Sequence, residues 1–333
     1  MPANVQTYGP RIKDLVPSSG IFPIYLREAL ELSPCPAIYH VVGLLAFVSA
    51  VVCPRTQLVR TVKGRRREED LTIWTFLVGP PNNGKSYSLK MCRKIGEEML
   101  RGRLMAPIGS IQGLEEALRV VPEPLLYMNE AARFLRENRA TWMRGDGAQF
   151  WCDVFDGELM DRSTQGADHD TESRKTGGRK VRISMAMAAA TGSLLRALKP
   201  GDWEGGLMSR VMMISAGRGQ ASDDWFDWSD PVRLRLQAML ADIQDFSRKN
   251  AEVGFDPAAY QVFKGWFHGT EDAMRGINTI HADALARLTR HVRVICGVYA
   301  ASCLTTTITV PMVRAAIALG DRARLCTLSL AIS

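Results

Sequence analysis

The spacing of apolar residues changes twice along the chain. Residues 24–33 place apolar side chains on one face of a helix, and residues 38–52 follow as an almost continuous apolar run. That run is shorter than the roughly 20 residues that cross a bilayer, so we interpret it as a buried helix. Two short strands around a basic turn at Gly64 come next. These patterns predict an N-terminal helical region with a basic hairpin over residues 1–70.

From residue 71 onward, short apolar strands alternate with helices. The predicted strands are residues 72–79, 106–110, 124–128, 181–192 and 210–215. Such alternation predicts a mostly parallel sheet with helices on both faces. Helical spacing returns later, at residues 230–250, 282–302 and 308–325. We therefore expect an α/β core over residues 71–217 and a C-terminal helical lid over residues 218–333.

The first predicted core strand runs into a glycine-rich loop. Residues 79–86 read GPPNNGKS, which has the spacing G-x-x-x-x-G-K-[ST] of a phosphate-binding loop. Tight turns at Gly79 and Gly84 allow backbone N–H groups to surround a phosphate, and the start of the next helix adds its positive dipole end. A surface glycine–lysine turn would need no strand before it. The motif predicts a site for ATP and Mg²⁺.

Nine consecutive residues form this predicted nucleotide site. They are Gly79, Pro80, Pro81, Asn82, Asn83, Gly84, Lys85, Ser86 and Tyr87. Lys85 is expected to reach the β- and γ-phosphates, which makes it a catalytic as well as a binding residue. The Ser86 hydroxyl is expected to hold Mg²⁺.

An acidic segment, LLYMNE at residues 125–130, supplies the second part of the predicted site. Glu130 is placed to polarise the attacking water. Enzymes that hydrolyse a nucleotide bound at a phosphate-binding loop usually have a metal-binding aspartate at the position of Asn129. Asparagine accepts through its carbonyl oxygen but brings no negative charge, so weaker Mg²⁺ binding is expected. Two interpretations remain open: slow hydrolysis through Glu130, or ATP binding without turnover.

Two further polar positions border the core strands. Thr191 or Ser193, at the tip of the strand predicted over residues 181–192, is a candidate to orient the attacking water; a capped turn is the alternative. Arg210 comes directly before the last core strand. There an arginine can enter the nucleotide site of a neighbouring subunit. An ordinary surface ion pair is the alternative for Arg210.

The net charge of +7 and the isoelectric point near 9.1 favour a polyanionic partner. Basic residues cluster at residues 60–67 and 174–182, and either cluster can also be a solvated loop. A third set, the helical stripe of Arg287, Arg290 and Arg293, is interpreted as solvated, with a lid arginine that reaches the nucleotide as the alternative.

The polar, glycine-containing segment at residues 165–181 is a candidate contact for single-stranded DNA. Its basic residues would bind phosphates and not base edges. The four candidates are Arg174, Lys175, Arg179 and Lys180. A mobile surface loop is the alternative. The seven cysteines include no C-x-x-C pair, which argues against a disulfide framework or a thiolate zinc site and favours a cytoplasmic protein.

Several of these segments together resemble one protein family. They are LVGPPNNGKS, LLYMNEAARFL, FDGELMDRST, GGLMSRVMMI and the tail RLTRHVRVICGVYAAS…ITVPMVRAAIALGDRA. In order and spacing they are similar to the P-loop ATPase domains of phages, plasmids and genomic islands, known as primase-associated helicases. The resemblance extends over about residues 22–325.

The resemblance implies a RecA/AAA+-like ATPase that assembles as a hexameric ring with nucleotide at the subunit interfaces. The matching functional positions are Gly84, Lys85, Ser86, Glu130 and Arg210, and Asn129 departs from the pattern. The expected function is a DNA helicase or translocase that serves replication of a phage or other mobile element, with a separate primase or replication protein as partner and no membrane. One alternative is an ATP-dependent DNA loader with slow hydrolysis. Another is an ATPase of phage defence or assembly that acts on protein.

Overall fold

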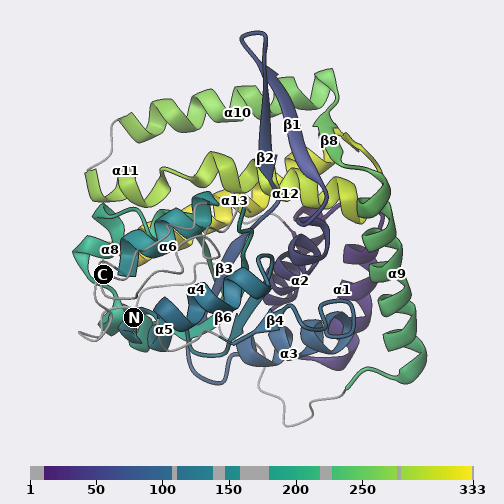
Figure 1. Ribbon diagram of the computed structural model, residues 1–333, viewed down its shortest axis with the longest axis horizontal. Coiled ribbons are helices and arrows are strands. Elements are labelled where there is room, and N and C mark those ends of the chain that lie inside the picture. The colour runs from purple at the N-terminus through teal and green to yellow at the C-terminus, as the bar shows by residue number, and fades with distance from the viewer. Residues whose placement is uncertain are drawn as a thin grey trace, which may run out of the picture.

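Two sheets organise the computed structural model, which describes residues 11–106, 111–137, 147–157, 180–217, 227–275 and 279–331 (Figure 1). The larger sheet has five parallel strands in the order β4-β5-β6-β3-β7. These are β4 (Leu104–Met105), β5 (Leu125–Met128), β6 (Ser184–Ala190), β3 (Trp74–Gly79) and β7 (Val211–Ser215). The predicted α/β architecture with a parallel sheet is thus confirmed. The predicted strand at residues 106–110 lies largely outside the described residues.

Alternating side chains of the five strands enter two separate cores. On β3, Trp74 and Phe76 face one core and Leu77 faces the other. On β6, Met187 and Ala188 divide in the same way. Because successive side chains of a strand point to opposite faces, a strand that is apolar at every position must be covered on both sides.

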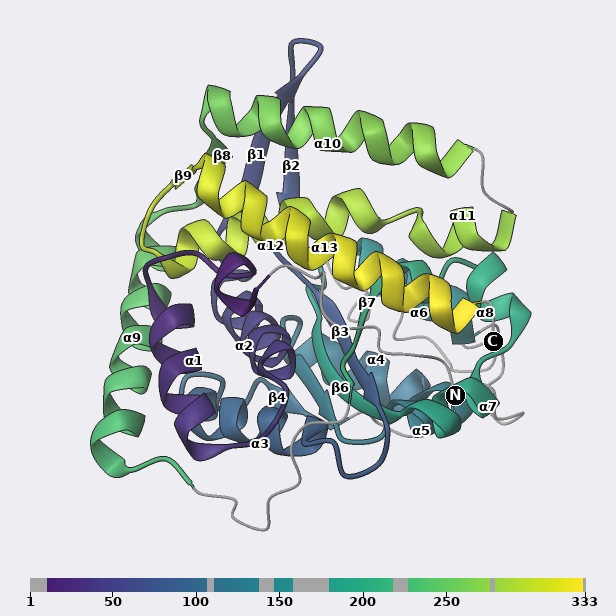
Figure 2. The ribbon, with the colours of Figure 1, turned by 180° about the vertical axis from the view of Figure 1, so that it is seen from behind.

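Helices cover both faces of this sheet (Figure 2). One core contains α1 (Ile21–Leu32), α2 (Ala37–Val52), α3 (Lys85–Gly96), α9 (Asp230–Lys249), α12 (Leu288–Ser302) and α13 (Val310–Ala331). The other contains α4 (Ile111–Val120), α5 (Ala131–Glu137), α6 (Gly147–Asp156), α7 (Thr191–Ala197) and α8 (Pro200–Glu204).

The long apolar run is the buried helix that its composition predicts. All residues of α2 from 38 to 52 are buried, and the helix packs against β3, β6 and α3. It therefore belongs to the core of the sheet, although it precedes the α/β segment in the chain. No helix of the described residues is long and apolar enough to cross a membrane.

The second sheet is mixed and has the order β2-β1-β8-β9. The predicted basic hairpin is confirmed: β1 (Gln57–Val62) and β2 (Arg65–Asp70) pair antiparallel. Its two turn residues, Lys63 and Gly64, both have positive φ, of 50° and 72°, which is typical of the tight turn that joins twisted strands. The strands β8 (Glu252–Phe255) and β9 (Thr307–Ile308) were not predicted.

The C-terminal helices differ from the prediction in two ways. The helix expected over residues 282–302 is divided into α11 (Thr279–Leu285) and α12, with the break at residues 286–287. The helix α10 (Pro257–Arg275) was not predicted. The remaining elements are two short 3-10 helices, η1 (Ile12–Asp14) and η2 (Met208–Arg210).

Candidate nucleotide site

The glycine-rich loop joins the end of β3 to the start of α3, the position that the phosphate-loop motif requires. Gly84 is the N-cap of α3 and has φ of 75°, in the left-handed region. A Cβ at this position would lie 2.1 Å from Sγ of Cys35. Both the backbone conformation and the lack of space therefore require glycine. Asn82 is also left-handed, with φ of 58°.

Lys85 lies over the loop that precedes it. Its side chain is buried, and Nζ donates to the carbonyl oxygens of Gly79 at 3.0 Å and Pro80 at 2.6 Å. Burial lowers the pKa of Lys85, and the nearby carboxylate of Glu130 opposes this shift. Two carbonyl bonds occupy two of the three ammonium N–H groups. An anion in the loop would be a far stronger partner for this partly desolvated cation than two neutral carbonyls.

Asn83 supports the loop from behind. Its Nδ2 donates to the hydroxyl of Tyr39 at 3.1 Å and to the carbonyls of Ala216 at 3.2 Å and Gly217 at 3.0 Å, just past the end of β7. The side chain of this predicted nucleotide-binding residue thus serves the loop structure.

Tyr39, a residue of α2 that sequence reasoning missed, holds the same region. Its hydroxyl donates to the carbonyl of Val78 at 2.7 Å and accepts from the backbone N–H of Ala216 at 3.2 Å. A Cβ at Gly79 would lie 2.3 Å from this hydroxyl, which explains the first glycine of the motif. The one available signal was a tyrosine within an otherwise apolar run.

Glu130 and Asn129 follow the carboxyl end of β5. The Glu130 carboxylate accepts from the backbone N–H of Ala132 at 3.2 Å, at the start of α5. Its negative charge opposes the lowering of the Lys85 pKa, which is consistent with a position near that lysine. Asn129 is exposed and forms a hydrogen bond with Tyr127. Burial raises the pKa of Tyr127, and this hydrogen bond partly offsets the increase.

Thr191 lies between the phosphate loop and the segment of Asn129 and Glu130. It is half-buried and is the first residue of α7, directly after β6. Because β6 lies between β3 and β5, and Ala190 is paired with Gly79, Thr191 lies beside the phosphate loop. Ser86 is exposed on the first turn of α3. The carboxyl edge of the sheet thus gathers the predicted residues Lys85, Ser86, Asn129, Glu130 and Thr191.

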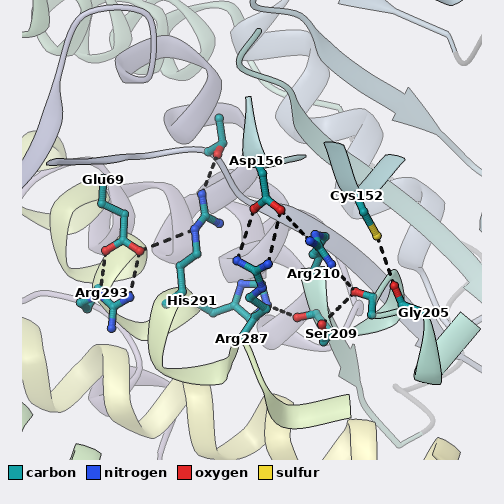
Figure 3. Close-up of polar contacts among 12 residues, drawn as sticks. Glu69, Cys152, Asp156, Gly205, Ser209, Arg210, Arg287, His291 and Arg293 are labelled. Carbon is teal, nitrogen blue, oxygen red and sulfur yellow. Dashed lines mark hydrogen bonds and ion pairs between the residues drawn. The ribbon is translucent and has the colours of Figure 1, made fainter. Parts of the chain in front are cut away.

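Arg210 lies at the opposite, amino edge of the sheet. Val211 is paired with Trp74, the first residue of β3, so about 17 Å of strand separates Arg210 from its own phosphate loop. Arg210 is buried; its Nη2 is 2.6 Å from Oδ2 of Asp156, and its Nη1 donates to the carbonyl of Gly206 at 2.9 Å (Figure 3). It is not the exposed surface pair that was the alternative.

The stripe of C-terminal arginines extends to one side of Arg210, and its interpretation as solvated is wrong. Arg287 pairs with Asp156 at 3.3 Å, and Arg293 pairs with Glu69 at 2.7 Å (Figure 3). Arg290 lies between them, 3.6 Å from Glu69, with its guanidinium 4.1 Å from the ring centre of Phe155. These ion pairs attach α12 and the residue before it to Asp156 at the end of α6 and to Glu69 in β2, and none of them involves a residue of the phosphate loop.

Of the four predicted DNA contacts, the structure describes only Lys180. Arg174, Lys175 and Arg179 lie outside the described residues. Lys180 forms an ion pair with Asp70, which also pairs with Arg182 at 3.0 Å.

No protein-family model matches the chain, and no curated protein matches it significantly.

Proposed function

We propose that this chain is a P-loop ATPase of the RecA/AAA+-like class that binds ATP and Mg²⁺ at residues 79–87 and acts on DNA as a ring-forming helicase or translocase. The observation that carries the proposal is the position of Lys85. Its buried ammonium bonds to two loop carbonyls at the junction of a parallel strand and a helix, and the negative charge of Glu130 acts on it. A purely structural lysine would more often be exposed or paired with a carboxylate.

The order of the strands supports the same class. The strand β6 lies between the loop strand β3 and the acidic strand β5, so three strand ends carry polar groups toward one place. Ligands of open α/β sheets bind outside the carboxyl ends of the strands. In ring-forming ATPases, the strand between the loop strand and the acidic strand ends in a polar residue that orients the attacking water. Here Thr191 directly follows that strand, β6.

Each polar residue of the site has a separate role in the proposed hydrolysis of ATP. Bound ATP supplies the phosphoryl group, and Mg²⁺ offsets its charge. Lys85 exchanges its carbonyl partners for phosphate oxygens, and the Ser86 hydroxyl ligates the metal. One oxygen of Glu130 bonds to the Ala132 N–H, which leaves the other to accept a proton from water that Thr191 orients.

The family resemblance of the motifs implies that Arg210 acts between copies of the chain. At the amino edge it lies too far from its own loop, so it meets a nucleotide only if the amino edge of one copy stacks against the carboxyl edge of the next. Such a head-to-tail contact is heterologous, and it closes into a ring when the rotation permits. In that arrangement Arg210 stabilises charge on the transferring phosphoryl group of the neighbour.

DNA as the target follows from the net charge of +7 and from the family resemblance of the motifs. One observation favours the second candidate, an ATP-dependent DNA loader with slow hydrolysis. Asn129 brings no charge to the metal and is exposed beside Tyr127. Strand displacement on a forked duplex separates the two candidates, because the loader binds the fork without unwinding it.

The test compares ATP hydrolysis and ATP binding in the unmodified protein, in Lys85→Ala and in a matched control. The control is Lys90→Ala, which removes an exposed lysine from the same helix. We expect Lys85→Ala to lose ATP binding and hydrolysis and the control to keep both. Unaltered binding and turnover in Lys85→Ala would overturn the proposal.

A further inference from the structure

The hairpin of β1 and β2 projects from the body of the protein and plays no part in the proposed nucleotide chemistry. Its tip stands beyond α10 in both views (Figures 1 and 2). Only residues 57–59 of β1 pair with β8. The outer pairs are therefore a two-stranded ribbon without a third strand among the described residues: Arg60–Arg67, Thr61–Arg66 and Val62–Arg65.

The two faces of this ribbon differ in charge compensation. On one face, Arg66 pairs with Glu68 at 2.9 Å and with Glu252 at 2.7 Å. Directly opposed residues share a face, so the other face carries Arg60, Arg65 and Arg67 together. We call this second face the arginine face. Lys63 occupies the exposed turn at its end.

The acid on the arginine face, Glu69, is shared with arginines of helix α12. It lies on the same side of β2 and is already paired with Arg293 and Arg290. For Arg65 and Arg67, which are exposed, no ion pair is found among the described residues. Two arginines directly opposite each other, as in the Arg60–Arg67 pair, destabilise a hairpin unless an anion lies between them.

Arg60 supplies a second, independent indication of an anion. Its Nε is buried and has no hydrogen-bond acceptor among the described residues. Burial lowers the pKa of Arg60, the charges of Arg293 and Arg67 lower it further, and the charge of Glu69 opposes this shift. A buried N–H of a charged group without an acceptor is costly, and an anion beside the half-buried Arg60 side chain would offset part of that cost electrostatically.

We propose that the arginine face, together with Lys63, binds the phosphate backbone of double-stranded nucleic acid. Arg65 and Arg67 are two residues apart, about 7 Å along the strand, and the phosphates of one nucleic acid strand advance about 3.4 Å each along the axis. The free ribbon extends about 10 Å beyond the sheet, and the major groove, about 12 Å wide, admits a two-stranded ribbon.

The chemistry of the ribbon favours this partner over other polyanions. A membrane-binding tip needs large apolar side chains to insert, and the only apolar residue of the outer pairs is the half-buried Val62. Arginine matches phosphate oxygens with two parallel N–H bonds. The rigid ribbon suits a groove of fixed width better than a flexible acidic peptide.

This site is independent of the nucleotide site. The chain passes from β2 to the first residue of β3, so the hairpin leaves the sheet at the amino edge, whereas the phosphate loop lies at the carboxyl edge. Lys85→Ala should therefore bind duplex as well as the unmodified protein. That result separates the two proposals, since either one can fail alone.

The test is a variant that removes charge and keeps the hairpin. It carries Lys63→Asn, because asparagine suits the positive φ of the turn, with Arg65→Thr and Arg67→Thr, because threonine suits a strand. The control variant, Lys13→Ala with Arg101→Ala and Arg235→Ala, removes the same number of exposed charges elsewhere. Circular dichroism and thermal melting establish that both are folded.

Binding of a labelled duplex of about 20 base pairs is measured by fluorescence anisotropy without nucleotide, between 50 and 200 mM salt. Loss of three phosphate contacts should reduce the slope of log K against log salt by about 2.7 and the affinity at low salt at least tenfold, and the control should keep the slope. Arg65→Lys with Arg67→Lys should also keep it, since lysine retains the charge.

Three outcomes would overturn the proposal. The first is an unchanged slope in the folded hairpin variant. The second is an equal loss of duplex affinity in the control variant. The third is a loss of affinity for single strands, anionic vesicles or polyglutamate without a loss of affinity for the duplex.

Discussion

The side-chain nitrogen of Asn83 lies 3.1 Å from the phenolic oxygen of Tyr39, so the back of the phosphate loop is hydrogen-bonded to helix α2. The same hydroxyl donates to Val78 at the end of β3 and accepts from Ala216 beyond β7. One buried hydroxyl therefore joins the loop, the helix and two strand ends. A loop held at this point keeps the turn that its backbone N–H groups need in order to face a phosphate.

Tyr39→Phe is expected to lower the free energy of unfolding by about 1–3 kcal/mol, because the polar groups of Asn83 and Ala216 lose a partner in a buried place. It should also weaken ATP binding, since the loop loses its rear support. Urea unfolding and titration with a fluorescent ATP analogue measure the two effects. The control, Tyr260→Phe on the half-buried face of α10, should change stability by less than about 0.5 kcal/mol. Equal stability of the two variants would show that the hydroxyl is dispensable.

Asn129→Asp is expected to reduce the Mg²⁺ concentration that gives half-maximal ATP hydrolysis. The change adds a carboxylate at the end of β5, beside Glu130 and across from the phosphate loop, and hard cations prefer charged oxygen ligands. Hydrolysis rates over a range of Mg²⁺ concentrations measure it. Glu130→Gln provides the contrast: it should lower the maximal rate by about 100-fold or more, with ATP still bound. An unchanged Mg²⁺ requirement in Asn129→Asp would place the metal away from position 129.

The sequence predicts those parts of the site that are local in the chain. The strand, loop and helix around Gly84 follow from spacing within about 20 residues, and the hairpin follows from alternation around Gly64. Tyr39 was missed because its contact with Asn83 joins segments 44 residues apart, and no local pattern reports such a distance. For the same reason, the long-range ion pair of Arg293 with Glu69 was mistaken for a solvated surface.

Arg210 leads to a prediction about mixed assemblies. Arg210→Ala should lower hydrolysis by about 1000-fold if the residue acts on the neighbour's nucleotide. A mixture of Arg210→Ala and Lys85→Ala chains should then recover part of the rate. In some interfaces, the intact phosphate loop of an Arg210→Ala chain meets the intact Arg210 of a Lys85→Ala chain. The measurement is the rate at constant total protein and varied mixing ratio.

Two controls keep this experiment interpretable. Arg210 is itself buried and pairs with the exposed carboxylate of Asp156, so its loss can destabilise the chain, and each variant must first be shown to be folded. Arg233→Ala removes an arginine of α9 whose pairing with Asp230 is largely exposed, and it should leave the rate unchanged. No recovery at any mixing ratio, with folded chains, would contradict action between subunits.

His291 makes stability depend on pH in a direction that its surroundings determine. Burial lowers its pKa from 6.5 to about 4, and the positive charges of Arg290 and Arg287 act in the same direction. The Ser209 carbonyl, 3.0 Å from Nε2, and the charge of Glu69 oppose this shift. In the unfolded chain this histidine takes up a proton below pH 6.5, while in the folded chain it stays neutral until about pH 4. Stability from His291 is therefore complete above about pH 6.5 and is lost as the pH falls toward 4, by about 3 kcal/mol in all.

The prediction is tested by urea unfolding of the unmodified protein and of His291→Gln between pH 7.5 and 4.5. Glutamine retains an N–H for the Ser209 carbonyl but does not titrate. Near pH 5 the dependence of the unfolding free energy on pH should be smaller in His291→Gln by about 1.2 kcal/mol per pH unit, which corresponds to nearly one proton. His40, whose pKa burial also lowers to about 4, is present in both proteins and cancels from the difference. The same slope in both proteins would mean that His291 is protonated in the folded chain or is accessible to water.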